Sequence, residues 1–203
     1  MTTPVDASAT TLTAICARAR RDAAPALQTP TRAVTYHTLI TDSYRAGNTL
    51  RYLGVDVGDH VAIDTTDLVR AIPAVLGAAQ LGAVSAIGPA MERAAVALMA
   101  APVTDPSAYD RLAVYGEAPS AAAVVHWEAT MWSENPAIHP VAVEADWPVL
   151  SDGARTWTHE EVMHRLGTVE EMPTVRGPIE AAQQLIDGVL AALARGSCVS
   201  IIA

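Results

Sequence analysis

Lysine and phenylalanine are absent from this sequence of 203 residues, and all 13 basic side chains are arginine. A phosphate-binding loop of the G-x-x-x-x-G-K-[ST] type, a pyridoxal-phosphate Schiff base and a lysine nucleophile each require a lysine, so all three are excluded. Alanine, by contrast, occupies 40 positions. Abundant alanine with arginine in place of lysine is typical of a GC-rich genome, and an acidic halophilic protein is the alternative interpretation.

Positive charge is also scarce, because 22 acidic residues outnumber the basic ones and give a formal net charge of −9. Nucleic-acid binding requires clustered positive charge, so we expect no nucleic-acid partner. Hydrophobic residues make up 51% of the chain and charged residues 17%, which is enough apolar material for a packed core. The length suits one domain covering residues 1–203.

The chain has only two cysteines, Cys16 and Cys198, and neither has metal-ligand spacing around it. We expect two reduced, buried thiols. The N-terminus shows no basic segment followed by a long apolar run, so no signal peptide is predicted. The apolar stretches 71–86 and 179–193 are interrupted by Gly, Pro, Gln or Asp. They predict no membrane span, and a cytoplasmic location is expected.

Short apolar strands alternate with helical patterns along most of the chain. This alternation predicts a three-layer α/β fold with a mostly parallel sheet and helices on both faces. A segment over 117–147, rich in Trp, Asn-Pro and His-Pro, is expected to be partly irregular, above all over 127–140. The predicted helices cover residues 10–21, 36–53, 67–81, 89–100, 158–166 and 178–195. The predicted strands cover residues 26–28, 32–35, 60–63, 83–87, 112–115, 120–126, 149–150 and 198–202.

One segment invites a metal-site interpretation, H-E-E-V-M-H at residues 159–164. Zinc proteases place two histidines at positions i and i+4 of a helix, on one face. Here the spacing is i and i+5, which turns His164 about 140° away from His159. We therefore expect a solvated helix surface and no metal. The sequence also contains neither G-x-S-x-G nor G-x-G-x-x-G, and no catalytic residue is predicted.

A more specific pattern runs over residues 33–89. It contains A-V-T-Y-H-T-L at 33–39, L-G-V-D-V-G-D-H-V-A-I at 53–63 and G-A-V at 82–84. This pattern resembles the start of the adenylate-forming superfamily, which includes acyl-CoA synthetases, luciferases and peptide-synthetase adenylation domains. Those proteins have a T-Y-x-E-L helix, an L-G-V-x-x-G-D-x-V-A-I segment, a further helix and a G-A-V strand. The resemblance implies the fold of their N-terminal subdomain.

The later sequence is similar to the same family with one segment shortened. Residues 146–150 lie where the family has the strand before its Ser/Thr/Gly-rich phosphate loop, and 190–199 resemble a later helix and strand. Residues 175–178 replace a histidine-containing segment of the family. In an alternative register, 152–161 resemble the T-Y-x-E-L motif itself. The resemblance implies that a remnant of the cofactor-binding loop consists of Ser151, Asp152, Gly153, Thr156, Thr158 and His159.

The segments that bind adenine, hold the metal and supply a C-terminal catalytic lysine in the family have no counterpart here. The resemblance therefore implies a catalytically degenerate relative without a cofactor, serving as an oligomeric interaction or regulatory module. Its expected partner is a second copy or a full-length synthetase, because the family's first subdomain packs against a second one. A small-ligand binder, for a nucleotide or acyl-CoA, is one alternative. The other is an enzyme of another class that uses Ser151, Asp152, Arg155, Thr156 and His159.

Overall fold

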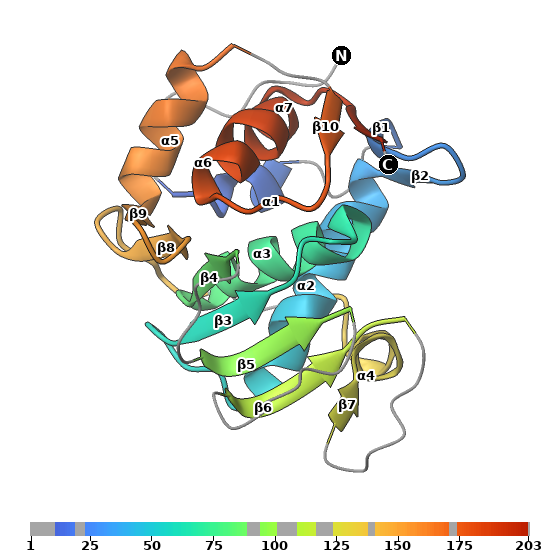
Figure 1. Cartoon of the computed structure of the whole chain (residues 1–203), viewed down its shortest axis with the longest axis vertical. Helices are drawn as coiled ribbons and strands as arrows, with labels where there is room; N and C mark the ends of the chain where they lie inside the picture. Colours follow the sequence, from blue (N-terminus) through green and yellow to red (C-terminus); the bar gives the residue numbers. More distant parts are fainter. Residues whose placement is uncertain are drawn as a thin grey trace.

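The computed structural model describes residues 11–18, 23–88, 94–100, 109–116, 124–137, 141–170 and 174–202. Its strands form two separate sheets (Figure 1). The seven-stranded sheet has the order β7 (Val124–His126), β6 (Tyr109–Val114), β5 (Ala94–Met99), β3 (His60–Ile63), β4 (Val84–Ile87), β8 (Pro148–Ser151) and β9 (Thr156–Thr158). The four-stranded sheet has the order β10 (Thr174–Arg176), β11 (Val199–Ile202), β1 (Pro25–Gln28) and β2 (Ala33–Thr35).

Both sheets are mostly parallel. In the larger sheet every pair is parallel except β8 with β9. In the smaller sheet β1 pairs with β11 in parallel and with β2 antiparallel. The predicted α/β class with a mostly parallel sheet is therefore confirmed. The division of the strands between two sheets is a feature that the sequence pattern does not show, because periodicity reports burial and not pairing.

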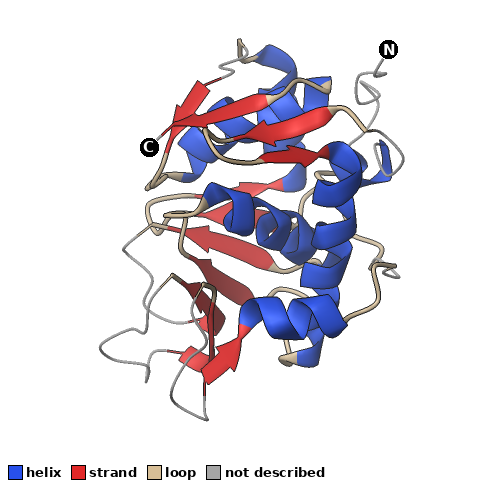
Figure 2. Ribbon diagram, turned by 90° about the vertical axis from the view of Figure 1, so that its right-hand side faces the viewer, coloured by secondary structure: helices blue, strands red, loops and turns tan. Residues whose placement is uncertain are grey.

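The helices connect and cover these sheets. Figure 2 shows helices gathered along one side of the strands in the lower part of the molecule, where Figure 1 places α2, α3 and α4. Of the helices that the structure describes, none is both long and apolar enough to cross a membrane. The helices are α1 (Ala14–Arg18), α2 (Tyr36–Tyr52), α3 (Leu68–Leu81), α4 (Trp127–Ser133), α5 (His159–Thr168), α6 (Ala182–Leu185), the π-helical η2 (Ile186–Leu190) and α7 (Ala191–Arg195).

One large apolar cluster joins the two sheets through the helices. The buried Tyr36 side chain donates its hydroxyl toward the carbonyl oxygens of Leu193 at 3.2 Å and Ser197 at 2.8 Å, which fixes α2 against the end of α7. Helices α2 and α3 approach closely at Gly77, where a Cβ atom would lie 2.6 Å from the backbone nitrogen of Gly47. The close approach therefore depends on a missing side chain.

The structure differs from the sequence-based prediction in several segments, including the unpredicted strands β9 and β10. The predicted helix over 89–100 is wrong for Ala94–Met99, which forms β5, while 89–93 lie outside the described residues. Strand β5 is largely buried between β3 and β6, so it lacks the alternation that marks a half-exposed strand. Its alanines favour a helix locally, and the tertiary pairing overrides them.

Part of the segment predicted to be irregular is regular, while 117–123 and 138–140 lie outside the described residues. The regular part contains β7 and α4, where Trp127 and Met131 are buried one helical turn apart. The last helix begins at Ala182 rather than at 178 and continues through the π-helical turn to Arg195. Residues 177–180 belong to neither a helix nor a strand, and they lie against the ends of β3 and β4, where Ile179 contacts Thr65 and Glu180 contacts Gly88.

Candidate functional site

The segment that the resemblance interprets as a shortened phosphate loop forms a tight hairpin between β8 and β9. Strand β8 ends at Ser151, β9 begins at Thr156, and α5 starts immediately after Thr158. This is the order that the first register of the resemblance predicts. The alternative register has a physical origin, since both β2 and β9 end in a threonine that caps the following helix, Thr35 and Thr158.

Asp152 closes the hairpin turn with its carboxylate. Its Oδ1 atom accepts hydrogen bonds from the backbone N–H groups of Ala154 at 3.2 Å and Arg155 at 3.0 Å. Its Oδ2 atom accepts one from the N–H of Ala182, at the start of α6, at 3.0 Å. Gly153 completes the turn with a φ angle of +80°. The backbone N–H groups that a phosphate would need are thus directed at a carboxylate.

The remaining polar groups of the hairpin are engaged in local structure. The hydroxyl of Thr156 and the N–H of Gly153 both reach the Ser151 hydroxyl oxygen at 3.4 Å. Thr158 forms a capping box with Glu161: its hydroxyl oxygen accepts from the Glu161 N–H at 3.2 Å, and its N–H donates to the Glu161 carboxylate at 2.9 Å.

The prediction of a solvated helix surface at 159–164 is wrong for His159. Its side chain is fully buried, while His164 is exposed. The His159 Nδ1 atom accepts a hydrogen bond from the backbone N–H of Leu12 at 3.1 Å, and burial lowers the pKa of the imidazole to about 4. In the part of the chain that the structure describes, no three His, Cys, Asp or Glu side chains are grouped to hold a metal ion.

The candidate residues of the hairpin do not converge on a common cavity. Arg155 lies on the outer side of the hairpin. Its guanidinium is 3.5 Å from the ring centre of Trp157 and 3.0 Å from the Glu161 carboxylate. His159 points into the core, and Asp152 is directed at backbone groups. The arrangement gives no support to an enzyme of another class built on these side chains.

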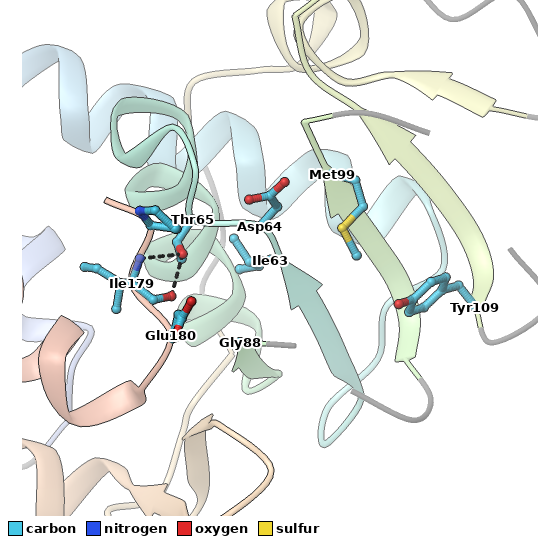
Figure 3. Close-up of a pocket in the computed structure, with 9 residues that line it drawn as sticks. Ile63, Asp64, Thr65, Gly88, Met99, Tyr109, Ile179 and Glu180 are labelled. Atoms are coloured by element: carbon cyan, nitrogen blue, oxygen red, sulfur yellow. Dashed lines mark hydrogen bonds between the residues drawn. The ribbon is translucent and has the colours of Figure 1, made fainter. Parts of the chain in front are cut away.

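A cavity lies instead at the carboxyl ends of β3 and β5. The chain leaves β3 toward β4 on one side, and it leaves β5 toward β6 on the other. Such a switch point in a parallel sheet opens a crevice where α/β proteins bind ligands. The cavity has a volume of about 280 Å³ (Figure 3). Its lining residues are Ile63, Asp64, Thr65, Gly88, Met99, Tyr109, Pro178, Ile179 and Glu180.

Asp64 ties the ends of the two strands together beneath this cavity. Its Oδ1 atom accepts hydrogen bonds from the Thr66 backbone N–H at 2.8 Å and from the Thr66 hydroxyl. Its Oδ2 atom accepts one from the N–H of Ala100, directly after β5, at 3.1 Å. Three backbone or hydroxyl donors of the chain thus engage this one carboxylate.

Residues 177–180 form the opposite wall. The Thr65 hydroxyl donates to the Ile179 carbonyl oxygen at 2.6 Å, and the Ile179 N–H donates back to the same hydroxyl oxygen at 2.9 Å. At Gly88 a Cβ atom would lie only 2.4 Å from the Glu180 carbonyl oxygen. The wall is thus fixed to the ends of β3 and β4 by a threonine and a glycine.

Sequence reasoning missed this site. Its only local signal is the polar triplet Asp64-Thr65-Thr66 directly after the apolar strand 60–63. Polar residues at the carboxyl end of a buried parallel strand are the ones that face a ligand crevice. The partner wall at 177–180 is more than a hundred residues further along the chain, so no spacing rule connects the two.

Comparison with known proteins shows which fold this is. No protein-family model matches the sequence, and no curated protein sequence matches it significantly. Solved structures do match. The anthranilate CoA ligase AuaEII, solved with anthranoyl-AMP, has a TM-score of 0.74 at 16% identity, over 94% of this chain and 44% of that one. The N-terminal domain of FACL13 from Mycobacterium tuberculosis has a TM-score of 0.71 at 17% identity, over 95% and 57%.

A benzoate CoA ligase from Burkholderia xenovorans LB400 matches with a TM-score of 0.69 at 20% identity, over 95% of this chain and 45% of that one. The chain thus spans about half the length of the structures it matches. At these identities the likeness concerns the fold. The chain has the fold of the N-terminal part of a CoA ligase, as the resemblance implies.

Proposed function

We propose that this chain does not form adenylates and instead acts as an interaction module that docks onto a second copy of itself or onto a full-length ligase. The observation that carries the first half of this proposal is the Asp152 carboxylate at the centre of the hairpin turn. It occupies the backbone N–H groups of the turn and places negative charge where a triphosphate would have to approach.

The cations of the hairpin do not offset this charge. The chain has no lysine, and Arg155 is the only basic residue between Ser151 and Thr158. Its guanidinium lies over Trp157 and pairs with Glu161 on the outer side of the turn. An ATP molecule at this hairpin would therefore meet a carboxylate without a free cation to balance it.

ATP–pyrophosphate exchange tests the absence of adenylation. The purified chain is incubated with ATP, magnesium and labelled pyrophosphate in the presence of benzoate, anthranilate or a fatty acid, with a benzoate CoA ligase as the positive control. We expect exchange at the level of the enzyme-free blank. Acid-dependent exchange above that level would overturn the proposal.

Exposed apolar side chains support the docking half of the proposal. Tyr52 is 72% exposed, Trp132 54% and Val57 49%. Large aromatic side chains are the residues that contribute most to protein–protein contacts. Size-exclusion chromatography with light scattering tests this prediction. We expect a mass of at least two chains of 21.2 kDa each. A monomer at high micromolar concentration that also fails to bind a full-length ligase would contradict it.

The cavity at the ends of β3 and β5 favours a second function, the binding of a small molecule. It combines a concave shape, apolar walls and a few fixed polar groups, as ligand sites do. Thermal-shift measurements with ATP, AMP, CoA, acyl-CoAs and small organic probes test this function, since a ligand of the folded state raises the unfolding temperature. Flat melting temperatures at millimolar ligand would exclude it.

A further inference from the structure

We propose that the cavity between the ends of β3 and β5 and residues 177–180 selects a small organic cation, an amine with an apolar or aromatic body, over carboxylates and phosphate esters. This inference rests on the small-molecule binding function proposed above and specifies its ligand class. A cationic ligand is opposite in charge to the carboxylic acids and nucleotides, which are the ligands that a ligase-like fold suggests first.

The charges of the lining residues set this preference. The ionisable side chains around the cavity are Asp64, Glu180 and Tyr109, and no arginine is among the described lining residues. The donors on Asp64 are backbone N–H groups and a hydroxyl, which carry no positive charge to neutralise a carboxylate. Glu180 is exposed, and its carboxylate has no ion-pair partner within the described ranges. An ammonium group would supply the missing counter-charge.

The apolar walls suit the body of such a ligand. Ile63 and Met99 come from neighbouring strands, Ile179 from the opposite wall, and the Tyr109 ring closes one side. Figure 3 shows Met99 and Tyr109 on one side of the space and Ile179 and Glu180 on the other. An aromatic face attracts a cation within about 6 Å of its centre, which adds to the preference for an amine.

The volume restricts the size. About 280 Å³ lies at the lower limit of small-molecule sites, so the ligand is expected to be smaller than a nucleotide or a CoA thioester. The charge of the whole chain also favours a cationic ligand, because a net charge of −9 enriches cations and depletes anions near the surface.

The test compares three probes of matched shape that differ in the head group: 2-phenylethylamine, 2-phenylethanol and 3-phenylpropanoate. Dissociation constants are measured by calorimetry or ligand-observed NMR at low salt and neutral pH. We expect the amine to bind at least tenfold more tightly than the alcohol, and the carboxylate not to bind. In Glu180→Gln the affinity for the amine is expected to fall about tenfold while the alcohol is unaffected.

Glu170→Gln is the matched control, because it removes one exposed carboxylate of the same type from a position that does not line the cavity. We expect it to leave the amine affinity within twofold of the unmodified chain. Urea unfolding of both variants confirms that they fold. An equal loss in both variants would show an effect of net charge alone and would overturn the assignment to this cavity.

The remaining outcomes distinguish a failure of the cation preference from a failure of the small-molecule binding function. If the alcohol or the carboxylate binds as tightly as the amine, the cation preference is wrong and the small-molecule function stands. If none of the three probes, nucleotides or CoA compounds binds, the small-molecule function fails and the inference fails with it. Neither result bears on adenylation, which pyrophosphate exchange tests separately.

Discussion

The Nδ1 atom of His159 accepts a hydrogen bond from the backbone N–H of Leu12 over 3.1 Å, and this contact joins the start of α5 to the segment before α1. Because Nδ1 is the acceptor, the proton of the neutral ring is on Nε2. That atom is buried and has no hydrogen-bond partner among the described residues. The contact therefore exists only while the imidazole is neutral.

We expect this histidine to make the fold sensitive to acid. Burial lowers the pKa of His159 from 6.5 to about 4 in the folded chain. The unfolded chain therefore binds the proton at higher pH, and the free energy of unfolding decreases as the pH falls from 6.5 to 4. The loss is expected to be about 3 kcal/mol over this range. Urea unfolding at a series of pH values measures it.

Two glutamine variants serve as controls. His159→Gln can still accept from Leu12 but does not titrate, so its stability is expected to be lower at pH 7 and flatter between pH 6.5 and 4. His164→Gln removes an exposed histidine from the same helix and is expected to keep the steep dependence of the unmodified chain. A slope that persists in His159→Gln would show that other groups cause it.

Asp152 is predicted to stabilise the hairpin rather than to bind a ligand. Asp152→Ala removes the acceptor for three backbone N–H groups, those of Ala154, Arg155 and Ala182. The free energy of unfolding is expected to fall by about 1–2 kcal/mol, as for the loss of a capping side chain. Asp152→Asn keeps one acceptor oxygen and should lose about half as much. A stability unchanged in both variants would contradict this role.

The local signals in the sequence were sufficient for much of the fold. Thr35 and Asp67 accept hydrogen bonds from the first turns of α2 and α3, and Gly82 ends α3 with a φ angle of +72°, as their positions in the sequence predict. These features depend on neighbours within about four residues of the chain. Such local signals can therefore be recognised from a single sequence.

What the sequence did not show depends on contacts between distant segments. Strand β5 pairs with β3 and β6, and its alanine-rich sequence alone predicts a helix. His159 is buried because it faces Leu12, 147 residues away, while the helix pattern alone predicts exposure. The cavity likewise requires Thr65 to meet Ile179, a contact between segments 114 residues apart.

The two cysteines are predicted to differ in reactivity. Burial raises the pKa of the Cys16 thiol to about 12, and the side-chain amide of Gln80 lies 3.1 Å from its sulfur. Cys198 is only partly buried, so the prediction of two buried thiols is wrong for this residue, although its partial burial also raises the pKa of its thiol. Because the reagent must reach a thiolate and only Cys198 is accessible, Ellman's reagent should modify Cys198 well before Cys16, which should react only after unfolding. In Cys198→Ser, the folded chain should show no fast-reacting thiol; a fast phase that persists would place Cys16 within reach of solvent.

Gly88 is predicted to be required for the wall of the cavity. Its φ angle of +96° disfavours any side chain, and a Cβ atom would lie 2.4 Å from the Glu180 carbonyl oxygen. Gly88→Ala must therefore displace residues 177–180 and weaken the two hydrogen bonds between Thr65 and Ile179. We expect the free energy of unfolding to fall by about 2–4 kcal/mol, from backbone strain and steric overlap together.

Gly116 separates these two effects. Its φ angle is +98°, nearly the same, but a Cβ atom there would meet nothing within 4 Å. Gly116→Ala therefore reports the strain alone, which is expected to be about 1–2 kcal/mol, and its affinity for 2-phenylethylamine should stay that of the unmodified chain. Gly88→Ala should lose that affinity as well as stability. Equal stability losses and unchanged binding in the two variants would show that residues 177–180 are not held against Gly88.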